Sequence, residues 1–225
     1  MTVGPQYGET WVYESIVGAL PGVDLTEGQA VAIQIGIFEA AVLAFGWYYG
    51  LPEAALAGTV AVAVAAVGSV AMLRFSRTTR AVPLPEAYRR LLFGSNVEVV
   101  LAVLAFVALV THVFVFDPSL FAGLFGPDPP VVVVYLTLLV LWDLCYRIGA
   151  SWWAAVVSLW RSVRYRFDAE SATSLRRADA INVGFAATQL ALLPFLADQP
   201  VLRLAVGGHV VAVGVVAGAA ILLLD

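Results

Sequence analysis

Six ionisable side chains lie inside stretches that are otherwise apolar, and they are the first candidates for chemistry. They are Glu39, Glu98, His112, Asp143, Arg147 and His209. A charge in an apolar medium is costly, so such groups pair with an opposite charge, change protonation or bind an ion. The three carboxylates outnumber Arg147, so two negative charges must take up protons, bind a cation or reach arginines in the loops. The excess predicts a proton or small-cation relay formed by the three carboxylates, with Arg147 as the fixed countercharge.

Uncharged polar residues at a similar depth are expected to support this relay. Gln34, Asn96 and Asn182 lie near the expected inner ends of their segments. A simpler interpretation remains for Asp143 and Arg147. They are four residues apart and face the same side of a helix, so they can form a salt bridge that only fastens the structure.

Motifs of known enzyme chemistry are missing from the chain. It has no HExxH metal motif, no glycine-rich phosphate loop and no GxSxG serine turn. His112 and His209 with the single cysteine, Cys145, are a weak metal signal, and we expect them to be structural. We therefore expect no catalytic residue, no metal and no cofactor, with an intramembrane enzyme as the alternative.

The elements that must position these side chains are transmembrane helices. The chain has 225 residues, of which 61% are hydrophobic and 12% charged, and its mean hydropathy is +0.91. A soluble domain carries about twice this charged fraction. A helix needs about 20 apolar residues to cross a bilayer. Six segments qualify, near residues 28–49, 53–73, 91–116, 131–152, 178–197 and 201–224. The expected fold is a single all-α membrane domain over residues 1–225, a polytopic bundle of six helices plus one or two interfacial helices.

The arginines predict the orientation of this bundle. Ten of the twelve lie in two stretches, residues 74–90 and 161–177, which join the second segment to the third and the fourth to the fifth. The connections at 50–52 and 117–130 contain no basic residue. Because short cytoplasmic loops are enriched in basic residues, the protein is expected in the cell membrane with both termini in the cytoplasm.

Two further stretches are expected at the membrane surface. Residues 1–27 include an amphipathic stretch that is too short to cross the bilayer. Residues 153–177 alternate apolar side chains with Arg161, Arg164 and Arg166, which is typical of a helix lying on anionic headgroups. The alternative is that the fourth helix continues straight into the cytoplasm.

The charge composition is unusual in a further way. Every basic residue is an arginine, and sixteen acidic residues give a net charge of −4. In this respect the chain resembles haloarchaeal multi-pass membrane proteins, which carry acidic exposed surfaces and little lysine. The resemblance covers composition alone and rests on no motif. It implies an archaeal, halophilic source and no particular activity.

Two functions from different classes follow from these features. The first is a translocator of protons or small ions through the carboxylate cluster. The second is a non-catalytic membrane scaffold or partner subunit, in which the carboxylates only fasten helices. The expected partners are the lipid bilayer, especially anionic lipids, and a second copy or another membrane protein, whereas no feature suggests nucleic acid.

Overall fold

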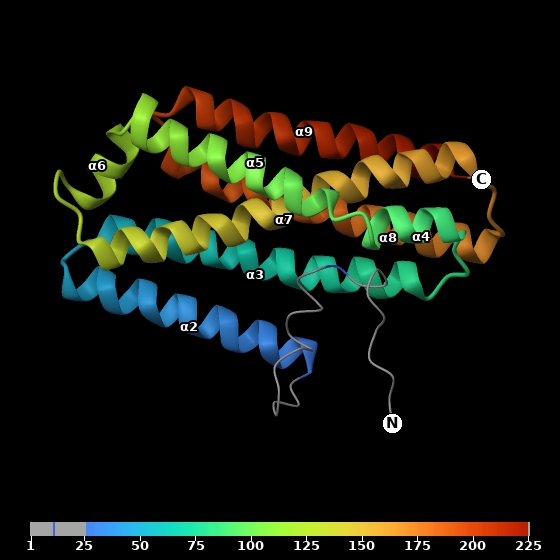
Figure 1. Ribbon diagram of the computed structural model, residues 1–225, viewed down its shortest axis with the longest axis horizontal. Helices are drawn as coiled ribbons and strands as arrows, with labels where there is room; N and C mark the ends of the chain where they lie inside the picture. Colours follow the sequence, from blue (N-terminus) through green and yellow to red (C-terminus); the bar gives the residue numbers. More distant parts are fainter. Residues whose placement is uncertain (1–10, 12–25, 225) are drawn as a thin grey trace.

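The computed structural model describes Trp11 and residues 26–224, and all regular structure in that part of the chain is helical. The elements are α2 (Glu27–Tyr48), α3 (Pro52–Arg80), α4 (Glu86–Phe93), α5 (Val97–Thr111), η1 (His112–Phe116), α6 (Ser119–Phe125), α7 (Val131–Arg164), α8 (Ala169–Thr188), η2 (Gln189–Leu196) and α9 (Pro200–Leu223). The η1 segment is π-helical and η2 is a 3-10 helix. The long helices run along one axis (Figure 1).

Six helical stretches of the described residues are long and apolar enough to cross a membrane. They are Gly28–Tyr48, Pro52–Arg80, Glu86–Phe116, Val131–Arg164, Ala169–Leu196 and Pro200–Leu223. The all-α prediction and the number of apolar helices are thereby confirmed. They indicate a multi-pass membrane protein.

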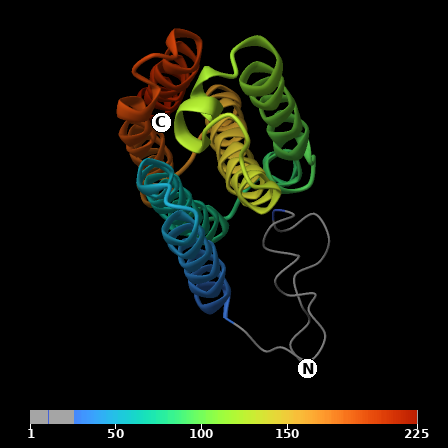
Figure 2. The same cartoon turned by 90° about the vertical axis from the view of Figure 1, so that its left-hand side faces the viewer.

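Helix α7 is the centre of the bundle. It packs against α2, α3, α4, α5, α8 and α9. Seen along the long axis, α2 and α3 lie on one side of α7, α8 and α9 on another, and α5 on a third (Figure 2). Helix α2 packs mainly on α3 and contacts α7 less. Side chains on α7 therefore meet residues from most of the chain.

The two arginine-rich connections lie at the same end of the bundle. Figure 1 shows the turn after α3 and the turn after α7 on its right-hand side, where the C-terminus also lies. The connections 49–51 and 117–130 and the turn before α9 lie at the opposite end. This arrangement matches the alternation of arginine-rich and arginine-free connections along the sequence.

Side-chain caps fix the starts of two helices. The Thr26 hydroxyl accepts a hydrogen bond from the Gln29 N–H at 3.2 Å, and the Thr26 N–H donates to the Gln29 side chain. This reciprocal pair is a capping box. At α8, the Asp168 carboxylate accepts hydrogen bonds from the Ser171 N–H at 2.9 Å and the Glu170 N–H at 3.1 Å. These bonds to Ser171 and Glu170 lower the pKa of Asp168, since they favour its charged form.

Helices α3 and α7 are longer than their apolar segments. The hydropathy pattern predicts ends near residues 73 and 152, but α3 continues to Arg80 and α7 to Arg164. Arginine is a good helix former, so a change from apolar to basic residues does not end a helix. The 34 residues of α7 span about 51 Å, against a hydrocarbon thickness of about 30 Å. Residues 153–177 do not form a separate helix: residues 153–164 continue α7, as the alternative predicts, and α8 begins at Ala169. A contact of this segment with the membrane surface stays a prediction.

The third predicted segment, 91–116, is not one continuous helix. Helix α4 ends at Phe93, and α5 begins at Val97 after a break in which Asn96 has a φ of 55°. Breaking a helix leaves its last carbonyls without intrahelical donors. Here the Leu91 carbonyl accepts from the Trp153 indole N–H at 3.0 Å and from the Ser95 hydroxyl at 2.7 Å. The break is therefore held by side chains from the break itself and from α7.

Trp11 closes the same break from the N-terminal side. Its indole N–H donates to the Leu92 carbonyl at 3.0 Å, and its ring packs on Phe75 and Phe93 at centroid distances of 5.8 and 5.3 Å. Trp11 is buried. The rest of the predicted interfacial segment 1–27 lies outside the described residues, up to residue 25.

Candidate functional site

The three carboxylates of the predicted relay lie in separate surroundings. Glu39 is half-buried, and its carboxylate accepts a hydrogen bond from the Thr59 hydroxyl at 2.8 Å, which links α2 to α3. Asp143 lies on α7 and Glu98 on α5. None of the three lines the cavity of about 790 Å³ at one end of the bundle. The three carboxylates, which are expected at a similar depth in the membrane, therefore do not share this cavity.

Asp143 and Arg147 form the salt bridge that their spacing predicts, which confirms the pair. An Arg147 guanidinium nitrogen lies 3.0 Å from the Asp143 carboxylate, and the Arg147 Nε donates to the Ala65 carbonyl of α3 at 2.7 Å. Asp143 also accepts a hydrogen bond from the Gln34 amide of α2 at 3.1 Å. The group therefore joins α2, α3 and α7. The void beside Asp143 has a volume of about 10 Å³, at the lower limit for one water molecule.

Asn182 also connects helices. Its amide donates to the Ser151 carbonyl at 2.9 Å, and the Ser151 hydroxyl donates back to the Asn182 carbonyl oxygen at 2.8 Å. Both side chains are buried between α7 and α8. Asn96, by contrast, forms the left-handed turn at the break before α5. Gln34, which donates to Asp143, is the third polar residue of the predicted relay. Gln34, Asn96 and Asn182 therefore lie in three different places.

Glu98 differs from the other two carboxylates. It lies in the first turn of α5, it is fully buried, and neither carboxylate oxygen has a hydrogen-bond partner among the described residues. The backbone of α5 at Glu98 and Ala102 lies against Gly149 of α7. Leaving a charged carboxylate unpaired in such a place is costly, so Glu98 is the member of the predicted relay with an unmet need for a proton or a cation.

The arginines predicted to contact headgroups or a partner divide into two kinds. Arg164 and Arg166 are exposed, and a headgroup contact for them stays a prediction. Arg161 is fully buried, and its guanidinium lies 2.6 Å from the Asp179 carboxylate of α8 and donates to the Tyr88 hydroxyl of α4 at 3.2 Å. The prediction for Arg161 is therefore wrong. The last turns of α7 pack against α4 and α8, which brings the Arg161 guanidinium to Tyr88 and Asp179.

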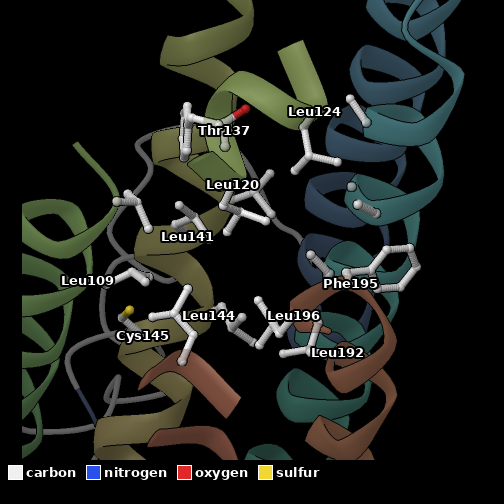
Figure 3. Close-up of a pocket in the computed structure, with 18 of the residues that line it drawn as sticks. Leu109, Leu120, Leu124, Thr137, Leu141, Leu144, Cys145, Leu192, Phe195 and Leu196 are labelled. Atoms are coloured by element: carbon white, nitrogen blue, oxygen red, sulfur yellow. The ribbon is translucent and has the colours of Figure 1, made fainter. Parts of the chain in front are cut away.

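A large cavity lies at the end of the bundle opposite the two arginine-rich connections. Its volume is about 790 Å³, and its walls come from the ends of α2, α3, α5 and α7 together with η1, α6, η2 and α9. Leucine, valine, phenylalanine and alanine make most of the lining, and Figure 3 shows leucines from several elements converging on it. Among the described residues that line it, none is Asp, Glu, Lys or Arg. Cavities of this size and character hold small apolar ligands in many proteins.

A few polar side chains interrupt this apolar lining. His112, His209 and Gln189 all line the cavity, and each has a buried side-chain atom without a hydrogen-bond partner among the described residues. For Gln189, which is fully buried, this holds for both the amide nitrogen and the amide oxygen. In the part of the chain that the structure describes, no three His, Cys, Asp or Glu side chains gather as a metal site would require.

Sequence reasoning does not single out Asp179 or Tyr88 as structural centres. The signal for Asp179 is weak, since an acid at the start of an apolar segment is typical of an exposed helix end. Gln189 is visible as an amide within an apolar segment, where it precedes Pro194 by five residues. Proline removes a backbone donor, and here the helix changes to 3-10 geometry at Gln189.

The comparisons with known proteins give a family and no activity. No curated protein and no solved structure matches the chain. A family model described as "Family of unknown function (DUF7530)" matches residues 6–220, which is nearly the full length. The chain therefore belongs to this family, DUF7530.

Proposed function

We propose that this multi-pass membrane protein binds an apolar, lipid-like molecule in the cavity at the end of the bundle opposite its two arginine-rich connections. The observation that carries the proposal is the cavity itself, at about 790 Å³ with an almost wholly apolar lining. Close packing is the rule in protein interiors, so a void of this size next to lipid favours an occupant. The positive-inside rule supports an orientation with the arginine-rich end and both termini in the cytoplasm, and the cavity in the outer half of the membrane.

Filling the cavity should displace its occupant. Ala57 lines the cavity on α3, whereas Ala63 on the same helix is exposed and does not line it. The Ala57→Phe substitution places a phenyl ring in the cavity. It should lower the amount of apolar molecule that copurifies with the protein about tenfold, which corresponds to about 1.4 kcal/mol of binding free energy. The measurement is organic extraction of the detergent-purified protein followed by mass spectrometry.

Ala63→Phe is the matched control and should retain the wild-type amount, since its ring faces outward. Wild-type protein that carries no such molecule would contradict the proposal. Equal retention by the two variants would do the same.

A second candidate function is translocation of protons or small cations, centred on Glu98 rather than on three carboxylates. It is favoured by the burial of this carboxyl without a partner among the described residues, two positions after the helix break at Asn96. Broken helices beside ionisable groups are typical of transporters. Glu39 and Asp143 each have a polar partner in a separate contact between or within helices. We assign these two carboxylates a role in holding the helices together.

Glu98→Gln tests this candidate in proteoliposomes that contain a pH-sensitive dye. It should abolish proton flux, because the amide keeps the shape of the side chain but cannot exchange a proton. Glu39→Gln is the control and should leave the flux within about twofold, since changes away from the path are usually small. Absence of flux in the wild type, or equal flux in Glu98→Gln, would remove this candidate.

A further inference from the structure

The polar groups in the cavity restrict what can occupy it. Gln189 contributes an amide with two N–H donors and a carbonyl acceptor, and these have no partner among the described residues. His112 and His209 each have a buried Nε2 atom that also lacks a hydrogen-bond partner among the described residues. An amide removed from water without a hydrogen bond is destabilising, whereas an apolar residue of the same shape is not. An occupant that carries a hydrogen-bonding group would satisfy these side-chain atoms.

The charge of the lining restricts that group further. No carboxylate, guanidinium or ammonium group lines the cavity among the described residues. A phosphate or a fatty-acid carboxylate would enter as an uncompensated charge in an apolar chamber, which is strongly unfavourable. A hydroxyl or carbonyl oxygen needs only the donors and acceptors that are present.

We infer that the cavity takes a neutral lipid whose polar end is a hydroxyl or carbonyl oxygen, and that the Gln189 amide receives this oxygen. The inference rests on the proposed function, because it names the class of molecule that the cavity binds. Gln189 carries the recognition since it is the most deeply buried of the three polar residues and both of its amide atoms are unpaired within the described part of the chain. The two histidines line the same chamber from η1 and α9.

Three radiolabelled probes with one alkyl chain separate the possibilities in the full-length purified protein. They are hexadecanol, hexadecane and hexadecanoate. Hexadecanol should bind about tenfold more tightly than hexadecane, as one additional buried hydrogen bond would give. Hexadecanoate should bind less tightly than hexadecanol, because no arginine or lysine among the described residues lines the cavity to compensate the charge of its carboxylate. This comparison is made on the wild type and needs no variant.

Gln189→Leu should reduce the preference for hexadecanol over hexadecane to about twofold or less while leaving hexadecane binding unchanged. The matched control is Thr137→Val, in the same cavity. The Thr137 hydroxyl already donates to the Val133 carbonyl at 2.8 Å, so its loss should leave the tenfold preference in place.

The outcomes distinguish this inference from the proposed function. Equal binding of hexadecanol and hexadecane to the wild type overturns the inference and leaves an apolar binding site. Tighter binding of hexadecanoate than of hexadecanol overturns the neutral class, and an unchanged preference in Gln189→Leu overturns the role of the amide. Failure of all three probes to bind, with equal copurification in the Ala57→Phe and Ala63→Phe variants, overturns the proposed function itself.

Discussion

Replacing Arg161 with methionine is expected to destabilise the protein by about 3–5 kcal/mol, because it breaks a buried ion pair. The guanidinium is fully buried against the Asp179 carboxylate at 2.6 Å and the Tyr88 hydroxyl at 3.2 Å. Its removal leaves the Asp179 charge buried without its cation. The expected fall in melting temperature, measured in detergent, is on the order of 10 °C.

A matched control for this substitution lies one helical turn further along α7. Arg164 is exposed, so Arg164→Met should change the stability by less than about 0.5 kcal/mol. The double variant Arg161→Met with Asp179→Leu should recover most of the stability, because a buried ion pair replaced by apolar residues is often neutral or stabilising. Equal melting temperatures for the Arg161 and Arg164 variants would show that the Arg161 pair is not buried in the folded protein.

Gly149→Ala is expected to destabilise the protein by about 2–3 kcal/mol, although alanine favours helices more than glycine does. A Cβ at Gly149 would lie 2.8 Å from the Ala102 backbone nitrogen and 2.9 Å from the Glu98 carbonyl oxygen. Both are backbone atoms of α5, and backbone cannot rotate out of the way as a side chain can. The substitution must push α5 away from α7.

Gly184→Ala, which makes the same chemical change, is expected to stabilise the protein rather than destabilise it. Gly184 lies in α8, and a Cβ there would meet no atom within 4 Å. That variant should gain about 0.5–1 kcal/mol from the better helix propensity of alanine. Thermal unfolding of the two variants in one detergent makes the comparison. If Gly149→Ala matched Gly184→Ala in sign, α5 and α7 would not approach as closely as the structure indicates.

The helix break at Asn96 and the close contact of Gly149 with α5 both position Glu98. Glu98 lies two residues after the left-handed turn at Asn96, and its backbone carbonyl is one of the atoms nearest to Gly149. The Trp153 contact with the Leu91 carbonyl holds the other side of the break. The buried position of the Glu98 carboxyl is therefore set by the α5–α7 contact and by the break together.

Much of the fold could be predicted because hydropathy is a local property. A run of about 20 apolar residues must become a helix in lipid, since every backbone N–H and C=O has to be satisfied within the segment. The six apolar helices, the pairing of Asp143 with Arg147 and the capping at Thr26 all follow from spacing along one segment. The ends of α3 and α7 could not be predicted in this way, because hydropathy marks where lipid contact ends and not where a helix ends.

The order of residues along the chain is enough to specify the all-helical class, the number of apolar helices and the alternation of arginine-rich and arginine-free connections. Three features depend instead on how the helices pack: the burial of Arg161 against α4 and α8, the separation of the three carboxylates, and the closure of an apolar cavity around Gln189. The physical reason is the range of the interactions. Helix formation depends on neighbours within a few residues, whereas burial of a charge or closure of a cavity depends on side chains brought together from helices far apart in the chain.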